Sequence, residues 1–172
     1  MRIEIWSDVV AVPTRDYLAR RFGPQATAMT TRVAELAKAE GLDFDFGAAL
    51  TVNTLDAHRL LHLAADLGVG DAAKERLLRA HFTEGADLSG QDTLARLLTE
   101  AGADEARVRA VLASDEYADA VRADFDEARM LGANGVPFFV IDRTYGVSGA
   151  QSAETFLHAL RTAYAAEDAA AR

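Results

Sequence analysis

Near the carboxyl end of the chain, residues 134–147 read NGVPFFVIDRTYGV, and this stretch decides the fold class. Its first four residues predict a turn, and Phe138–Ile141 is an apolar run of the length expected for a buried strand. Residues 142–144 can turn, and residues 145–147 then predict a second strand. We therefore expect a β-hairpin, followed by a final helix that Ser152 caps and whose alanine-rich tail frays.

A further strand is predicted at the other end of the chain. Within residues 2–6, Ile3 and Ile5 share one face of a strand, and Glu4 and Trp6 share the other. A single strand needs a partner, so we expect this one to join the hairpin in one sheet.

The residues between these strands have the apolar periodicity of helices. Helices are expected over residues 13–22, 25–40, 54–67, 71–84, 92–101, 104–113 and 115–131, and several of them end at a glycine. The helix over 25–40 has apolar residues every three or four positions, which predict one buried face: Ala26, Met29, Val33, Leu36 and Ala37. Residues 42–46 fit either a short strand or an extended loop.

This order of elements predicts an α/β fold in which a small sheet carries a large helical insertion. Residues 1–12 and 132–172 are expected to form the α/β core, and residues 13–131 to form the helical insertion domain. The chain's 172 residues are enough for such an arrangement, and too few for two full independent domains.

Composition excludes several classes of function. The net charge is −9 and no run of Lys or Arg stands out, so nucleic acid is not an expected partner. No apolar stretch approaches the roughly 20 residues that cross a bilayer, and the first residues do not resemble a signal peptide, which predicts a cytoplasmic protein without membrane contact. The absence of cysteine excludes disulfides, thiolate nucleophiles and thiol-ligated metals.

Four segments carry a specific resemblance. They are IEIWSDVV at 3–10, NTLDAHRL at 53–60, GVPFFVID at 135–142 and VSGAQ at 147–151. In this order they resemble the DsbA-like family that includes FrnE and is related to 2-hydroxychromene-2-carboxylate isomerases and kappa-class glutathione transferases. The resemblance implies a thioredoxin-like (DsbA-like) sheet with a helical insertion, and descent from protein-disulfide oxidoreductases.

The chain departs from the family where the catalytic motif is expected. The family has Cys-Pro-Trp-Cys after the first strand, whereas this chain continues with Ala11-Val12-Pro13-Thr14. We interpret this as the loss of one block that holds the redox motif, its helix and the second strand. Ala11 and Thr14 are then the nearest equivalents of the catalytic pair, and the sheet is reduced in strands. Losing the covering helix would expose apolar side chains, which predicts a homodimer or a marginal fold.

The resemblance also implies binding residues. Val136-Pro137 occupies the place of the family's cis-proline loop, which pairs with extended substrate backbone, so a cis bond is expected there. Four more residues correspond to groups that lie near the thiol substrate in glutathione-using relatives: Asn53, Ser148, Gly149 and Gln151. The residue types themselves favour capping and turn formation, and both interpretations stay open.

Other candidate sites are weaker. His58 and His62 could share a helix face, but there is no third ligand at an obvious spacing, so no metal is expected. Asp43 and Asp45 look like a carboxylate pair, yet alternation of Asp with Phe is more typical of a solvated strand face.

Three functions remain open. The first is an oxidoreductase by descent that is redox-inactive because it lacks cysteine. The second is a glutathione-dependent isomerase or transferase that would use the hydroxyl of Thr14. The third is a non-catalytic module that binds an extended peptide or a thiol-bearing small molecule.

Overall fold

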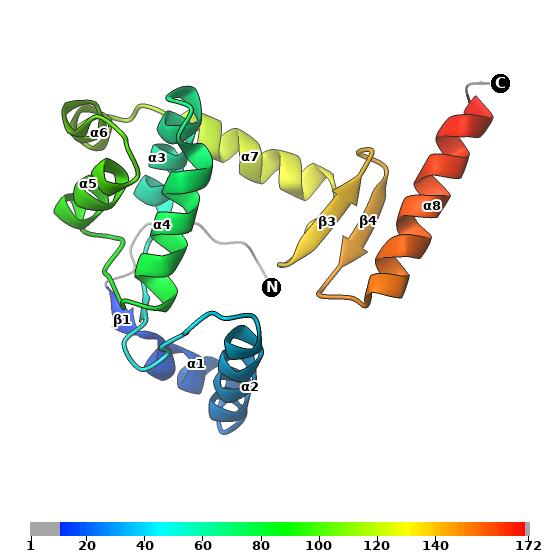
Figure 1. Ribbon diagram of the computed structural model, residues 1–172, viewed down its shortest axis with the longest axis horizontal. Helices are drawn as coiled ribbons and strands as arrows, with labels where there is room; N and C mark the ends of the chain where they lie inside the picture. Colours follow the sequence, from blue (N-terminus) through cyan, green and yellow to red (C-terminus); the bar gives the residue numbers. More distant parts are fainter. Residues whose placement is uncertain (1–10, 171–172) are drawn as a thin grey trace. The chain divides into compact units, whose positions relative to one another are not determined.

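The computed structural model describes residues 11–170, with side chains as far as residue 167. The strand predicted over 2–6 and the whole of the first resembling segment, residues 3–10, lie outside this range. The described elements are β1 (Val12–Pro13), α1 (Thr14–Phe22), α2 (Gln25–Ala39), β2 (Leu50–Thr51), α3 (Leu55–Asp66), α4 (Gly70–Phe82), α5 (Gln91–Glu100), α6 (Glu105–Leu112), α7 (Ala118–Met130), β3 (Phe138–Ile141), β4 (Tyr145–Ser148) and α8 (Ala153–Ala170) (Figure 1).

The chain divides into two compact units within α7. Of the described residues, those up to Val121 form one unit, called here the helical unit, and those from Arg122 form the other, called the hairpin unit. The predicted division into residues 1–12 with 132–172 and residues 13–131 stays a prediction. Within the described residues, no helix is long and apolar enough to cross a membrane.

The core of the helical unit is built by α3, α4, α5 and α6. In it, α3 packs against α4 and α6, and α5 packs against α4 and α6. Each helix contributes one apolar stripe, as its periodicity predicted, and burial of each large side chain stabilises the fold by about 1.5–3 kcal/mol. The largest of the fully buried side chains on these helices are Leu60, Leu63, Leu94, Leu97, Leu98, Val108 and Val111.

A buried arginine on α3 fastens the end of α6. Arg59 is only 5% exposed. Its Nε donates to the carbonyl of Glu116 at 2.8 Å, and one terminal nitrogen donates to the carboxylate of Asp56 at 2.7 Å. The other terminal nitrogen donates to the carbonyls of Val111 and Ser114. Two of the three carbonyls belong to the turn after α6, and the third, that of Val111, also accepts from the amide of Ser114. Arg59 therefore ties the end of α6 and the turn after it to α3.

The helix α7 begins three residues later than predicted. Tyr117 has φ of +63°, which is in the left-handed region, so the helix cannot run through it from Asp115. The backbone makes a turn instead, in which the amide of Ala118 donates to the carbonyl of Asp115 at 3.0 Å. The hydroxyl of Tyr117 donates to Asp66 on α3 at 2.6 Å, which fixes this turn on the helical unit.

Helices α1 and α2 form a pair, and the short β1–β2 sheet connects this pair to the rest of the helical unit. Strand β1 pairs antiparallel with β2, with Val12 opposite Thr51 and Pro13 opposite Leu50. Helix α1 packs against α2. Both helices end as predicted, because Gly23 and Gly41 follow them with φ of +60° and +77°.

The buried face predicted for α2 is wrong in part. Ala26 and Ala37 are buried, whereas Met29, Val33 and Leu36 are exposed. The chain turns back after α2, where the amide of Leu42 donates to the carbonyl of Ala37 at 2.9 Å. The larger apolar residues lie on the neighbouring stripe of the helix, which explains why periodicity alone joined the two sets.

Residues 42–46 form an extended loop rather than a strand. The ring of Phe44 stacks on that of Phe82 with centroids 4.7 Å apart, and the amide of Asp45 donates to the carbonyl of Phe82 at 2.7 Å. Gly85 is needed nearby, because it has φ of +63° and a Cβ there would lie 2.7 Å from Ala48. The loop is therefore fixed against the end of α4.

The hairpin unit contains the predicted pair of strands. β3 and β4 are antiparallel, with Phe138 opposite Ser148 and Ile141 opposite Tyr145. Helix α8 packs against both strands. The expectation of a buried strand is wrong in part, since Phe139 and Val140 are exposed. Helix α8 continues to Ala170, and the fraying expected from residue 167 stays a prediction.

Candidate functional site

The predicted site residues Ala11, Thr14 and Asn53 lie in the helical unit, around β1 and β2. Ala11 packs against the helical core. The amide of Thr14 donates to the carbonyl of Ala49 at 3.0 Å, and its hydroxyl lies 3.2 Å from the hydroxyl of Thr51. The β1–β2 pairing thus places a hydroxyl pair two residues before Asn53. Thr51 was not predicted, because its role depends on a pairing of strands 37 residues apart.

Asn53 acts as a cap in this structure. Its side-chain oxygen accepts a hydrogen bond from the amide of Leu55 at 2.8 Å, at the first residue of α3. This satisfies one of the amides that the start of a helix leaves without a partner. Among residues 11–170, the side-chain amide nitrogen of Asn53 has no acceptor, so it can donate to a ligand.

The other predicted site residues lie together in the hairpin unit. The Val136–Pro137 peptide bond is cis. The carbonyl of Pro137 accepts from the amide of Gly149 at 2.9 Å, and the side chain of Gln151 donates to the carbonyl of Ser148 at 2.8 Å. The entry to β3 and the exit from β4 therefore form one structured corner.

The corner presents both an apolar and a polar surface. Val136 is 70% exposed, and Ser148 and Gln151 are exposed as well. Gly149 takes φ of +82°, a conformation that glycine adopts without steric cost. Such a corner can accept the backbone and one side chain of an extended ligand.

Comparison with known proteins assigns the family. A family model for a DsbA-like thioredoxin domain matches residues 3–161. The chain belongs to the DsbA-like thioredoxin family. The crystal structure of a probable DsbA oxidoreductase from Streptomyces coelicolor is 42% identical to it, with a TM-score of 0.84, and the match covers 91% of this chain and 69% of that chain. No curated protein matches the chain.

Membership of the DsbA-like family confirms the predicted fold class, an α/β thioredoxin-like fold with a large helical part. It also supports the prediction that the chain is related to DsbA-like oxidoreductases. The chain contains no cysteine. The FrnE-like subgroup and the loss of a Cys-Pro-Trp-Cys block stay predictions.

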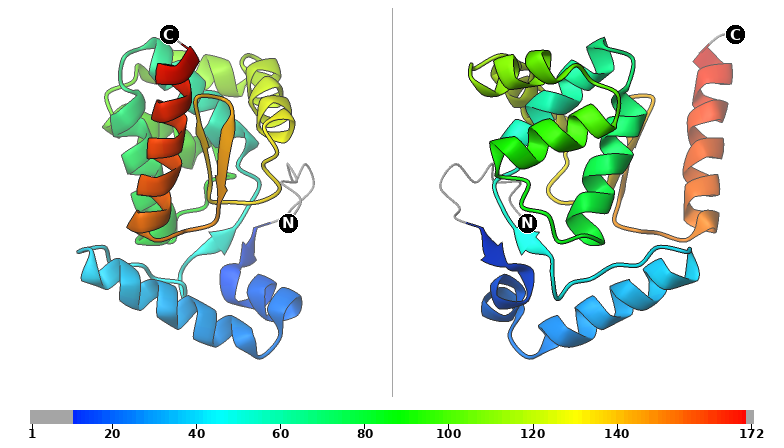
Figure 2. Two further views of the ribbon diagram at one scale, coloured as in Figure 1. Left: turned by 90° about the vertical axis from the view of Figure 1, so that its right-hand side faces the viewer. Right: turned by 60° about the vertical axis from the view of Figure 1, so that its left-hand side comes forward.

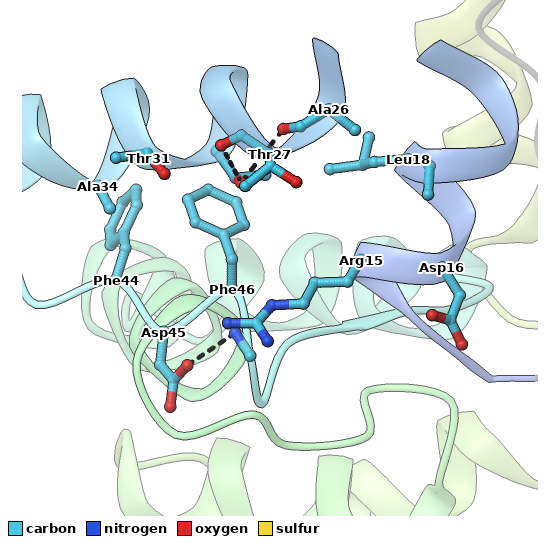
Figure 3. A pocket seen from close by; sticks show the side chains of 13 residues that line it. Arg15, Asp16, Leu18, Ala26, Thr27, Thr31, Ala34, Phe44, Asp45 and Phe46 are labelled. Atoms are coloured by element: carbon cyan, nitrogen blue, oxygen red, sulfur yellow. Dashed lines mark hydrogen bonds between the residues drawn. The ribbon is translucent and has the colours of Figure 1, made fainter. Parts of the chain in front are cut away.

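The helical unit of this DsbA-like chain also contains a cavity of about 510 Å³ that was not predicted. It lies between α1, α2 and the loop at residues 44–47, and Figure 3 shows the side chains that line it. Asp45 belongs to this loop, where its Oδ1 accepts from the amides of Gly47 at 2.7 Å and Ala48 at 3.1 Å. The carboxylate of Asp45 is exposed to solvent, and it stabilises the turn of the loop through these two hydrogen bonds.

The two histidines of α3 do not form a recognisable metal site. Within residues 11–170, no group of three His, Cys, Asp or Glu side chains is placed to hold a metal ion. The ring of His62 stacks on Tyr117 with centroids 6.1 Å apart. The hydrogen bond that Tyr117 donates to Asp66 raises the pKa of the phenol above its usual value.

His81 on α4 makes stability depend on pH. Its Nδ1 is buried without a hydrogen-bond partner among the described residues, and burial lowers the pKa of the ring. The unfolded chain therefore binds the proton more readily than the folded chain. The contribution of neutral His81 to folding stability is fully present above the unfolded-state pKa of 6.5. We expect this contribution to be lost as the pH falls from 6.5 through the lower folded-state pKa.

A His81→Leu variant is expected to lose part of this pH dependence. The measurement is the urea midpoint of the parent and the variant at about pH 7 and about pH 5, within the range where histidine titrates. His158→Leu is the matched control, because His158 is exposed on α8. An equal fall in midpoint for the parent and His81→Leu would contradict the assignment.

Proposed function

We propose that this chain is a DsbA-like protein that binds extended polypeptide and does not exchange disulfides. Thiol-disulfide exchange needs a thiolate that attacks sulfur, and the 172 residues contain no cysteine. The family and the probable DsbA oxidoreductase from Streptomyces coelicolor support descent from proteins that act on polypeptides. The resemblance of residues 53–60 and 135–142 supports the FrnE-like subgroup.

The observation that carries this proposal is the exposed residue Val136 before the cis peptide bond. Within the described residues, no hydrogen bond is made by the Val136 backbone, whereas the next carbonyl, that of Pro137, is held by Gly149. An extended peptide gains affinity by pairing with such free main-chain groups, and the exposed Val136 side chain adds apolar contact. We propose Ser148, Gly149 and Gln151 as the other wall of this peptide site.

A paired activity assay tests the absence of redox chemistry. The purified chain is compared with a relative that contains CxxC in insulin reduction and in oxidative refolding of a reduced protein, each with and without glutathione. We expect no turnover in any condition. Turnover only with glutathione would favour an isomerase or transferase that uses Thr14 and Asn53, and turnover without it would refute the proposal.

Binding is tested at Val136. We expect Val136→Glu to weaken binding of a fluorescently labelled, uncharged extended polypeptide about tenfold, because a charge replaces an apolar contact worth about 1.4 kcal/mol. Fluorescence anisotropy gives the dissociation constants. Val33→Glu is the matched control, since Val33 is 43% exposed on α2 of the helical unit. Equal affinities for the parent and Val136→Glu, or an equal loss in both variants, would contradict the peptide site.

A further inference from the structure

The cavity of the helical unit is separate from the residues of the peptide site and has the features of a small-molecule site. We propose that it binds a small organic anion that has a flat apolar body. Its volume of about 510 Å³ lies within the range of about 300–1,000 Å³ typical of such pockets. The cavity is formed entirely by α1, α2 and the loop at residues 44–47 (Figure 3).

Two aromatic rings give the cavity an apolar wall. The rings of Phe44 and Phe46 lie 6.2 Å apart at 81° to each other. Figure 3 shows both rings directed at α2, where Ala34 faces them, and Leu18 of α1 lies farther along the cavity. Phe44 is held by its stacking on Phe82. Because one side of this wall is fixed, a flat apolar group can enter with little loss of side-chain freedom.

Arg15 supplies the positive charge. It is the one cation among the described lining residues, and its guanidinium makes no ion pair or hydrogen bond with any other described residue. In Figure 3 its side chain extends from α1 beneath Phe46 towards the loop. A guanidinium in this position can donate two parallel hydrogen bonds to a carboxylate or sulfonate.

The lining carboxylates do not neutralise this charge by contact. Asp45 is occupied by the amides of Gly47 and Ala48. Asp16 lies on the far side of Arg15 from the two rings, and its carboxylate points away from them (Figure 3). Oδ1 of Asp45 does lie close to the Arg15 guanidinium, since both border Gly47. The two amides that donate to this oxygen reduce its repulsion of an anion bound at Arg15.

The threonines of α2 add polar contacts. The hydroxyl of Thr30 already donates to the carbonyls of Ala26 at 3.2 Å and Thr27 at 3.0 Å. The hydroxyls of Thr27 and Thr31 also line the cavity and make no hydrogen bond to another described residue. They can bond an oxygen or nitrogen of the ligand, which favours an anion with one further polar group over a plain hydrocarbon.

The test uses the full chain and two fluorescent probes with the same ring system. 8-Anilinonaphthalene-1-sulfonate carries a negative charge, and N-phenyl-1-naphthylamine does not. We expect Arg15→Gln to weaken binding of the sulfonate about tenfold and to leave binding of the neutral probe unchanged, as expected for loss of one charge-assisted contact. Arg20→Gln, which changes a cation of α1 outside the cavity lining, should alter neither affinity.

A second variant tests the apolar part of the site. Ala34→Met places a longer side chain against the phenylalanine rings, so it should weaken binding of both probes about fivefold or more while the circular dichroism spectrum stays the same. An unchanged sulfonate affinity in Arg15→Gln, an equal loss in Arg20→Gln, or unchanged affinities in Ala34→Met would each overturn the proposal. The first result would place the probe on another apolar surface, such as Met29, Val33 and Leu36 of α2.

Discussion

Replacing Arg59 by methionine is expected to lower the free energy of unfolding of the helical unit by about 3–5 kcal/mol. Methionine fills a similar length of space but donates no hydrogen bond. The carbonyls of Ser114 and Glu116 would then lose the arginine donor, and Asp56 would lose its cation. The carbonyl of Val111 would keep only its bonds from Ser114. A buried polar group left without its partner costs about 1–3 kcal/mol.

The loss at Arg59 should be local as well as large. Urea unfolding followed by circular dichroism gives the stability, and hydrogen exchange of residues 111–117 reports the end of α6 directly. Arg109→Met is the matched control, because Arg109 is an exposed arginine on α6 that pairs with Glu105 and Asp92. Exposed pairs contribute about 0–1 kcal/mol, so a comparable effect of both substitutions would refute the role given to Arg59.

Features that depend on a few neighbouring residues could be predicted from the sequence. Gly23 and Gly41 correctly marked the ends of α1 and α2, because a left-handed residue after a helix is a local requirement. Asp104 was correctly predicted to open α6, and its side chain accepts from the amide of Arg107. The β3–β4 hairpin was predicted from one apolar run and the turn residues after it.

Features that depend on tertiary contacts could not be predicted. Periodicity shows which face of α2 is apolar, but it does not show whether anything covers Leu36. The start of α7 was missed because the left-handed conformation of Tyr117 is accompanied by its bond to Asp66, 51 residues earlier. Nothing in the sequence marks Arg59 as buried, since its carbonyl partners lie more than 50 residues away.

The candidate sites show the same limit. Val136 and Gly149 were named because they lie in segments that resemble a known family. In the structure, the amide of Gly149 donates to the carbonyl of Pro137, next to Val136. Arg15 had no such signal. It becomes a candidate only when α1, α2 and the loop at residues 44–47 enclose a cavity around it. A charged side chain at a helix start is otherwise an ordinary surface residue.

Replacing Leu97 by alanine is expected to destabilise the helical unit by about 2–5 kcal/mol. Leu97 lies on α5 and is 0% exposed, within the cluster that joins α3, α4, α5 and α6. Alanine would remove apolar contacts and leave a cavity that the surrounding helices can only partly fill. Urea unfolding, together with hydrogen exchange of α5 and α6, measures the change.

Leu36→Ala provides the matched control for the core, since Leu36 has the same side chain but is 60% exposed on α2. Exposed substitutions usually change stability by less than about 0.5 kcal/mol, and alanine also favours the helix slightly. A large loss at Leu36 would mean that its face of α2 is covered in solution, as the predicted homodimer would require. In that case the loss should increase with protein concentration, because a dimer is stabilised by mass action, whereas the loss at Leu97 should not.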